Sequence, residues 1–256
     1  MPNSISHKIS VITINLNNKN GLEKTIQSIT KQTYDYFEYI VVDGLSTDGS
    51  LDVIEDHKHK ITKKIIEKDS GIYDAMNKGI RMATGEYLLF INSGDWLVSE
   101  DTLALLVSYT NDDTDIIYGN LSFHDPSNGS ETIGSYPEKL TFKYFTHRSL
   151  PHQATLIKSI LFEEVGLYDT SYKIVSDWGF FCLAICKHQK SYKKIPLTVS
   201  NFPLDGIGST QVNLRSQERK DFLEKHFKLF IDDYATHKNL LLSPPVRIIN
   251  KIFKIA

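Results

Sequence analysis

Apolar segments alternate with polar turns at a regular spacing over the first part of the chain. Four apolar segments are typical of strands and lie at residues 9–16, 39–42, 65–66 and 87–91. Three intervening segments carry apolar residues at helical spacing and lie at residues 21–31, 51–54 and 72–83. Strands and helices in this alternating order predict a mostly parallel sheet with right-handed crossovers, as in α/β proteins.

The second part of the chain has a less regular pattern. Helical spacing of apolar residues is found at residues 103–109, 161–166 and 178–187. One further strand is predicted at residues 115–119. Residues 122–136 contain Pro, Gly, Ser and Asn, so this segment is predicted to be a loop or a hairpin.

The most informative segment is the fourth predicted strand with the turn that follows it, EYLLFINSGDW (residues 86–96). The strand is apolar on both faces, which indicates a strand buried on both sides in the centre of a sheet. It runs into the polar turn at residues 92–94 and then reaches Asp95. Ligands of α/β sheets bind at the carboxyl ends of strands, so Asp95 is predicted to face a crevice. A carboxylate there suits a hard divalent cation that carries phosphate oxygens.

Polar side chains also mark the ends of the other three predicted strands. They are Thr13, Asn15, Asn17 and Asn18 for the first strand, Asp43 for the second and Asp69 for the third. Taken alone, an aspartate at a strand end is more often a turn or cap residue, and this interpretation of Asp43 is favoured on the strand-end position alone. Together these residues describe a polar crevice along one edge of the sheet. Asp43 and Asp69 could accept hydrogen bonds there from a base imide or a ribose hydroxyl.

Two common nucleotide-binding motifs are absent from the sequence. No G-x-G-x-x-G follows the first strand, and there is no Walker loop. A dinucleotide dehydrogenase and a P-loop NTPase are therefore disfavoured. A diphosphate bound by this chain would need a metal ion and scattered donors in place of a glycine-rich cradle.

Composition and charge narrow the class of protein. A hydrophobic content of 41% and a charged content of 23% are ordinary for a soluble globular protein, and a net charge of -2 gives no reason to expect nucleic acid as a partner. No apolar run approaches the ~20 residues of a membrane span, and the polar N-terminus shows no signal peptide, so we expect a cytoplasmic protein. Cys182 and Cys186 are interpreted as two core thiols in preference to a metal or redox pair.

Four segments of the chain follow one another in an order found in a known enzyme family. They are VITINLNNKNGLEKTIQSITKQTY (residues 11–34), VVDGLSTDGS (41–50), EKDSGIYDAMNKGIRMATGEYLLFINSGD (67–95) and PHQATLIKSILFEEVGLYDTSYKIVSDWGF (151–180). On these segments the chain resembles the family 2 glycosyltransferases of bacterial cell-surface polysaccharide synthesis, in particular the colanic-acid and capsule transferases. The resemblance implies the α/β GT-A fold, a Rossmann-like and mostly parallel central sheet flanked by helices, with a C-terminal helical extension.

The resemblance also implies roles on the donor side of the site. The positions that hold the base and ribose of the nucleotide are matched by Thr13, Asn15, Asp43 and Asp69, and those that line the donor site by Asn77 and Lys78. Asp95 matches the last acid of the Asp-x-Asp metal motif of the family, which implies Mn²⁺ or Mg²⁺ as the cofactor.

On the acceptor side, the resemblance makes Asp177 the catalytic base. Residues near the acceptor or the donor sugar are implied to be His152, Gln153, Trp96, Gly208 and Ser209, the last two in an altered form of the Gly-Gly-x-Ser loop of the family. Taken alone, Asp177 could equally be the N-cap of the helix predicted at residues 178–187, and His152 is more often a structural histidine.

The chain departs from the family pattern at three places. Ser93 and Gly94 stand where the earlier acid of the metal motif is expected, so Asp95 has no second carboxylate beside it in the sequence. Ser176 precedes Asp177 where many members have a Glu. The Gln-x-x-Arg-Trp signature of processive members is missing, because residues 211–215 have the wrong spacing and no Trp. We therefore expect one sugar to be added in each cycle.

The predicted function is a metal-dependent inverting glycosyltransferase. It would move one sugar from a nucleotide diphosphate sugar, with a UDP-sugar favoured, to a hydroxyl of a glycan or lipid-linked glycan. Residues 1–98 are predicted to bind the nucleotide-sugar, residues 99–210 to form the acceptor-binding half of the same domain, and residues 211–256 to form a helical extension.

Two other functions were compared with this prediction. A sugar nucleotidyltransferase would need a glycine-rich, basic loop after the first strand, and residues 15–21 offer asparagines and one lysine instead. A non-catalytic protein that holds a nucleotide-sugar or a partner enzyme stays open because the metal motif is altered, although an intact Asp177 argues against it.

The tail of the chain has two interpretations. Arg247, Lys251 and Lys254 share one face of a helical pattern at residues 246–255, and apolar residues share the other. A helix that packs on its own domain is favoured. The alternative is a helix that lies on an anionic membrane, which would place the protein at the inner face of the cell membrane.

Overall fold

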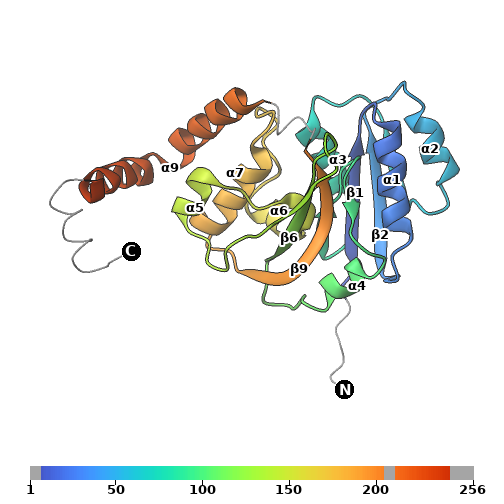
Figure 1. The fold of residues 1–256 in the computed structure, drawn as a ribbon, viewed down its shortest axis with the longest axis horizontal. Helices are drawn as coiled ribbons and strands as arrows, with labels where there is room; N and C mark the ends of the chain where they lie inside the picture. The colour runs from blue at the N-terminus through green and yellow to red at the C-terminus, as the bar shows by residue number, and fades with distance from the viewer. Residues whose placement is uncertain (1–6, 205–210, 243–256) are drawn as a thin grey trace, which may run out of the picture. The chain divides into compact units, whose positions relative to one another are not determined.

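The computed structural model describes residues 7–204 and 211–242. The chain divides into one unit of residues 1–210 and a second unit of residues 211–256. Within its described residues, the first unit contains a nine-stranded sheet of order β3-β2-β1-β4-β8-β6-β9-β5, with β7 paired to β6 (Figure 1). The strands are β1 (Ile9–Asn15), β2 (Phe37–Asp43), β3 (Lys63–Ile66), β4 (Tyr87–Phe90), β5 (Trp96–Leu97), β6 (Ile116–His124), β7 (Glu131–Gly134), β8 (Thr155–Lys158) and β9 (Tyr192–Pro203).

Short and medium helices connect these strands. They are α1 (Lys19–Thr30), α2 (Ser50–Asp56), α3 (Ile72–Met82), α4 (Thr102–Val107), α5 (Phe142–His147), the 3₁₀ turn η1 (His152–Ala154), α6 (Leu161–Glu164), α7 (Ser176–Cys182) and the π-helical turn η2 (Leu183–Lys187). The alternation of strands and helices predicted for the first part of the chain is confirmed, and the segment predicted as a loop or hairpin is the β6–β7 hairpin.

The first half of the sheet is parallel, as the alternating pattern predicts. β3, β2, β1 and β4 all run in the same direction, with Asn15 beside Asp43 and Asp43 beside Ile66. The carboxyl ends of β1 and β2 are therefore level with each other. Asp69 is the third residue after the end of β3, so the polar strand ends gather at one edge.

The second half of the sheet is mixed, which differs from the mostly parallel sheet that we expected. β8 is antiparallel to both β4 and β6, and β5 is antiparallel to β9, whereas β9 is parallel to β6. Antiparallel strands need no helical crossover between them, so the alternating pattern that indicates parallel strands is missing here. Because β8 runs against β4, the residues just before β8 lie beside the carboxyl end of β4. This places His152 and Gln153 next to the turn that carries Asp95.

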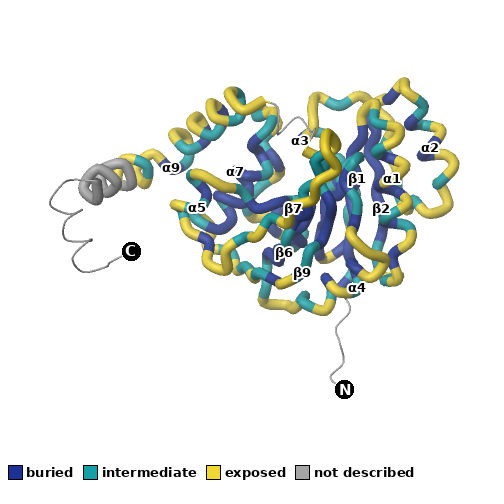
Figure 2. The backbone as a smooth tube through the Cα atoms, in the orientation of Figure 1, coloured by how far each residue is buried: buried dark blue, intermediate teal, exposed yellow. Residues whose placement is uncertain are grey.

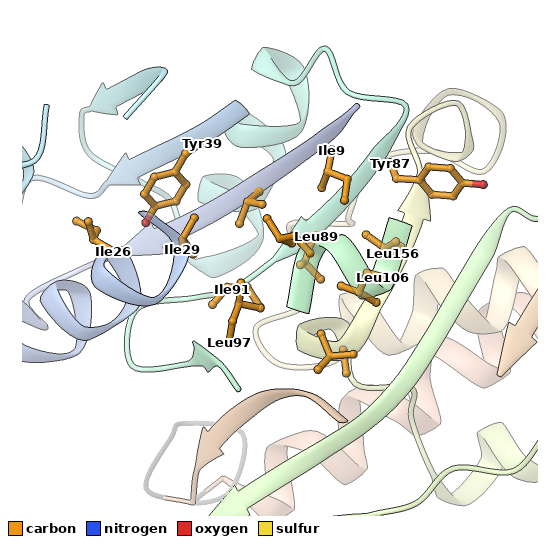
Figure 3. Packing of buried hydrophobic residues seen from close by; sticks show 14 of the residues in the cluster. Ile9, Ile26, Ile29, Tyr39, Tyr87, Leu89, Ile91, Leu97, Leu106 and Leu156 are labelled. Carbon is orange, nitrogen blue, oxygen red and sulfur yellow. The ribbon is translucent and has the colours of Figure 1, made fainter. Parts of the chain in front are cut away.

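The core packs on both faces of the sheet. On one face, Leu22 and Ile26 of α1 join a cluster with Val11 and other buried strand residues (Figure 3). On the other face, α3 lies so close to β1 that a side-chain carbon at Gly79 would come within 2.5 Å of Ile12. Buried strands lie between helices whose outer surfaces are exposed (Figure 2). The packing of α1 and α3 on the two faces of the sheet thus fixes the position of the polar end of β1.

A buried ion network closes the opposite edge of the sheet. The side chain of Glu38 is 3% exposed and accepts hydrogen bonds from Ser10 Oγ (2.6 Å) and from the Thr84 main chain, and it pairs with Lys63 Nζ at 2.8 Å. Burial alone would raise the pKa of Glu38, but its hydrogen bonds with Lys63, Ser10 and Thr84 lower it to about 2. This carboxylate links β1, β2, β3 and the start of β4 far from the polar crevice.

The second unit contains the helix α9 (Val212–Leu242), which has a kink at Phe227. Across the described residues of both units, we find no helix with the length and apolar character needed to cross a membrane. The predicted amphipathic pattern at residues 246–255 lies outside the described residues.

Candidate functional site

The ends of β1 and β2 carry a hydrogen-bonded cluster of polar residues, which we take as the candidate donor pocket. Asn15 Nδ2 donates to Asp43 Oδ2 at 2.7 Å, and the main-chain N–H of Ser46 donates to Asp43 Oδ1 at 2.7 Å. Asp43 is fully buried and does have the turn role that the local sequence favoured. Asn15 is 3% exposed, and its Oδ1 is buried with no hydrogen-bond partner among the described residues. The amide cannot be flipped without placing two oxygens together, so this buried oxygen remains an acceptor without a partner among the described residues.

Asp69 joins this pocket from the loop after β3. A side-chain carbon at Gly44 would lie 2.8 Å from Asp69 Oδ2, so only glycine allows this approach. Lys78 of α3 holds the other carboxylate oxygen at 2.7 Å and also contacts Glu67 at 3.0 Å and Asp74 at 3.6 Å. Asp69 and Lys78 therefore form a fixed pair at the edge of the pocket.

Two of the residues predicted to contact the nucleotide form hydrogen bonds with other groups of the protein. Thr13 is fully buried; its hydroxyl donates to the Ile91 carbonyl at 2.6 Å and accepts from Tyr39 at 3.0 Å. Asn77 is 3% exposed, and its amide makes two hydrogen bonds with the main chain of Tyr168, at 2.8 and 3.0 Å. A direct contact of either side chain with a ligand would require these hydrogen bonds to break.

Asp95 lies in a turn that α1 holds in place. The hydroxyl of Thr25 donates to the Asp95 carbonyl at 2.6 Å and accepts from the Gly94 main chain at 3.0 Å. Gly94 has a φ of 104°, which an L side chain adopts only with strain. Asp95 is 5% exposed. Burial raises the pKa of its carboxyl to about 7, although the charge of His152 and a hydrogen bond with Gln153 lower it.

Asp177 lies at the start of α7 and is not the N-cap of that helix. The N-cap position belongs to Val175, and Asp177 is in the first turn. Its Oδ1 accepts a hydrogen bond from Tyr73 Oη at 2.7 Å, and its Oδ2 lies 2.9 Å from His152 Nδ1. Asn92 Nδ2 lies 3.2 Å from the other ring nitrogen of His152. Burial would raise the pKa of Asp177, but the hydrogen bond and charge of His152 and the hydrogen bond of Tyr73 lower it below its usual value.

Asp177 and Asp95 thus both interact with His152, Asp177 through a close contact and Asp95 through the charge of the ring. The side chain of Asp177 keeps 16% of its surface exposed and that of His152 keeps 15%, so both can be reached from solvent. A partly exposed carboxylate held by two donors is suited to act as a general base, and a buried carboxylate that interacts with the same histidine can offset the charge of a cation.

The remaining predicted residues border this arrangement. The side chain of Gln153, which is 6% exposed, contacts Asp95, and its carbonyl accepts from Ser200 Oγ at 2.7 Å. The ring of Trp96 has Lys24 Nζ 2.9 Å from its centroid and the His124 ring at 5.0 Å. Gly208 and Ser209 lie outside the described residues.

The side chains around Asp95 determine how a divalent metal ion could bind there. The described residues contain no group of three or more His, Cys, Asp or Glu side chains that could hold a metal. A metal at Asp95 would therefore have fewer than three such ligands from the described residues, and burial leaves the carboxyl of Asp95 with a raised pKa. These residues fit a metal that arrives with a diphosphate, because the phosphate oxygens and water would supply the other ligands.

The structure adds two residues that sequence reasoning did not place in the site, Tyr73 and Asn92. Asn92 belongs to the polar turn before Asp95, so its position was a usable signal. Tyr73 is 104 residues from Asp177 in the sequence, and it reads as an ordinary apolar position of α3. Only the folded structure reveals its contact, a hydrogen bond between residues far apart in the chain.

Comparison with known proteins agrees with this geometry. The model of glycosyl transferase family 2 matches residues 10–166. A PGL/p-HBAD biosynthesis glycosyltransferase of Mycobacterium tuberculosis is 34% identical over 177 residues, which cover 67% of this chain and 67% of the relative.

Solved structures show the same fold at low sequence identity. Residues 1–349 of TarS from S. aureus, in complex with UDP-GlcNAc, align with a TM-score of 0.65 at 17% identity, over 86% of this chain and 73% of that one. A mannosyltransferase of Pyrobaculum calidifontis, in complex with GDP-Man and Mn²⁺, aligns with a TM-score of 0.62 at 15% identity, over 98% of this chain and 85% of that one. These likenesses confirm the predicted GT-A fold, and with the family match they show that the chain is a glycosyltransferase and belongs to glycosyl transferase family 2.

Proposed function

We propose that this protein is an inverting glycosyltransferase that moves one sugar from a nucleotide diphosphate sugar to a hydroxyl of a glycan or lipid-linked glycan. The observation that carries the proposal is the partly exposed carboxylate of Asp177, which Tyr73 and His152 hold, together with the buried carboxylate of Asp95, which also interacts with His152. A relative named as a PGL/p-HBAD biosynthesis glycosyltransferase and structures solved with UDP-GlcNAc and GDP-Man support the same class of reaction.

The nucleotide would bind at the pocket formed by Asn15, Asp43 and Asp69. The unpartnered Oδ1 of Asn15 would accept a hydrogen bond from a base N–H, and Asp69 would accept one from a ribose hydroxyl. Thr13, Asn77 and Lys78 would contribute to donor binding indirectly, because they hold the residues of this pocket in position. A UDP-sugar is favoured because a base with an imide N–H matches these acceptors.

Asp95 would hold Mn²⁺ or Mg²⁺ together with the diphosphate of the donor. When bound, the cation would offset the negative charge that builds up on the leaving diphosphate. Gln153 and the Thr25-braced turn would keep the Asp95 carboxylate in place.

The chemistry assigned to the chain itself is one proton transfer. Asp177 would take the proton of the acceptor hydroxyl as that oxygen bonds to the anomeric carbon, from the face opposite the diphosphate. The bond between the anomeric carbon and the diphosphate oxygen breaks, and its electron pair leaves with the diphosphate. Holding both substrates in line makes the reaction effectively unimolecular. His152, Gln153 and Trp96 would border the bound acceptor or donor sugar.

A thermal-shift screen of nucleotide diphosphates with Mn²⁺ tests donor binding. A ligand at a hundred times its dissociation constant should add about 2.7 kcal/mol of stability. UDP or a UDP-sugar should raise the melting temperature more than ADP does. No shift with any nucleoside diphosphate, with or without metal, would contradict the proposed donor class.

A further inference from the structure

Asp177 is held from two sides by groups that belong to different elements. Tyr73 of α3 donates to one carboxylate oxygen at 2.7 Å, and His152 of η1 lies 2.9 Å from the other. The main-chain N–H of Trp178 adds a third interaction. A carboxylate can only accept hydrogen bonds, so the hydroxyl of Tyr73 must be the donor in this contact. The hydrogen bond is therefore stronger to the ionised acid than to the protonated acid.

Tyr73 is well placed to keep this contact rigid. It is 5% exposed in the first turns of α3, and its ring packs 5.6 Å from the ring of Tyr168. Asn77, one helical turn later, fixes the main chain of Tyr168 through two hydrogen bonds. The close packing of Gly79 on Ile12 anchors the same helix to β1. The hydroxyl of Tyr73 thus has little freedom to leave Asp177.

We infer that Tyr73 is a positioning residue for sugar transfer: its hydroxyl holds Asp177 ionised and turned toward the acceptor. The inference rests on the proposed function, in which Asp177 accepts the proton of the acceptor hydroxyl. His152 holds the second oxygen, so rotation of the carboxylate would break both contacts. Tyr73 touches neither substrate and acts only through Asp177.

Loss of the Tyr73 hydroxyl is expected to change the pH dependence of turnover. The groups that face Asp177 are Tyr73 from α3, His152 from η1, the Trp178 main chain of α7 and Tyr168 from the segment before α7. Burial raises the pKa of Asp177, and the donors from His152 and Tyr73 lower it. Loss of the Tyr73 hydroxyl removes one lowering contribution, so the pKa of Asp177 rises. Because the base works only when ionised, the acid limb of the turnover profile moves to higher pH.

The test uses Tyr73→Phe in the full chain, because phenylalanine keeps the ring packing and removes only the hydroxyl. The carboxyl carbons of ¹³C-labelled aspartates are titrated by NMR, and the signal of Asp177 is the one that disappears in Asp177→Asn. We expect this signal to titrate at higher pH in Tyr73→Phe than in the wild type. We expect turnover to fall ~10-fold at neutral pH, with the KM for the donor changed less than twofold.

Tyr87→Phe is the matched control. Tyr87 is also a buried tyrosine, and its hydroxyl donates to the carbonyls of Asn111 and Thr114 at the other end of β4. This variant loses buried hydrogen bonds, so its stability should fall, but its Asp177 titration and its acid limb should match the wild type. A shift of the Asp177 titration in both variants would show a general loss of structure and overturn the inference.

Two results separate this inference from the proposed function. An unchanged Asp177 titration in Tyr73→Phe overturns the inference even if the enzyme transfers sugar. If Tyr73→Phe still lowers turnover when added to Asp177→Asn, Tyr73 acts by another route and the inference is also wrong. A raised Asp177 pKa in a protein that transfers no sugar from any nucleotide donor would support the contact between Tyr73 and Asp177 and refute the proposed function.

Discussion

Two carboxylates that are close in space have opposite electrostatic surroundings. Burial raises the pKa of Asp95 to about 7, because the only groups that favour its charge are His152 and Gln153 and an N–H near Asn92. Donors on both oxygens lower the pKa of Asp177 despite burial. A buried carboxylate that few groups stabilise favours a cation, and one that is held ionised is ready to accept a proton. Two acids with such different surroundings are suited to different roles.

At the residue scale we predict that Asp69→Ala weakens UDP binding by about 1–3 kcal/mol, because a buried hydrogen bond to the nucleotide is lost. Calorimetry measures the change. Glu67→Ala is the control, because Glu67 pairs with the same Lys78 but its side chain is 60% exposed. Equal UDP affinity in the wild type and Asp69→Ala would contradict the assignment of Asp69 to the donor pocket.

Single residues were predictable from sequence where they follow a strand in the chain. Asn15, Asp43, Asp69 and Asp95 stand at or after strand ends, and the structure brings the first three together in one pocket. The sequence could not show that the side chains of Thr13 and Asn77 form their hydrogen bonds with other groups of the protein. It also could not show Tyr73, because its contact with Asp177 depends on how two distant helices pack.

At the scale of elements, the parallel half of the sheet was predictable and the mixed half was not. β1 to β4 and their helices have clear local periods, 2 or 3.6 residues, that show in the sequence. β5 has two residues and β8 has four, and both find their place only by pairing with distant strands. The direction of β8 places His152, just before the strand, in contact with Asp177 and Asn92.

The Glu38 network links strands at the edge opposite the site and predicts a pH effect. The pKa of Glu38 is lowered from 4.5 to about 2 in the folded protein. Its stabilising effect is therefore complete above pH 4.5 and is lost as the pH falls toward 2. We predict that Glu38→Gln lowers stability at pH 7 and flattens the loss of stability with acid, as followed by urea unfolding between pH 7 and pH 3.

Glu55→Gln serves as the control for this prediction. The Glu55 side chain is 55% exposed and pairs with Lys58 and Lys64 at the surface, where such pairs contribute little. Its unfolding profile with pH should follow the wild type. The same acid dependence in Glu38→Gln and the wild type would show that Glu38 is not the group that sets it.

At the scale of the whole molecule, motif order carried more information than any single residue. The four segments that carry the family motifs, at residues 11–34, 41–50, 67–95 and 151–180, lie in different elements. Together their order indicates the fold and family that the comparisons with known proteins confirm. Composition could only exclude classes of protein. We propose that the acceptor binds near Trp96 and His152, and no sequence period reports the side-chain shapes there.

The tail has a sequence pattern that is also found in helices that bind membranes. Residues 246–255 lie outside the described residues, and their basic and apolar faces support a proposal that they bind anionic lipid. If the membrane alternative holds, the full chain should pellet with anionic liposomes more than a chain cut after Ser243, and high salt should remove the difference. Equal and negligible pelleting of the two chains would mean that the tail does not bind membrane.

The central claim is that Asp177 and Asp95 have different roles in one reaction. Asp95→Asn should weaken binding of Mn²⁺ with the nucleotide-sugar and slow turnover, because the charge it provides acts in the bound complex and in the transition state. Asp177→Asn should leave donor affinity nearly unchanged, because its role begins when the acceptor hydroxyl loses its proton.

The most direct test is the turnover of Asp177→Asn with a saturating donor. Asparagine keeps the shape of the side chain and cannot take a proton. A positioned general base contributes ~10²–10⁴ in rate, so we predict a loss of that size with the KM for the donor nearly constant. Turnover of at least half the wild-type value would contradict the account, and the base would then have to be sought elsewhere, with His152 as the first candidate.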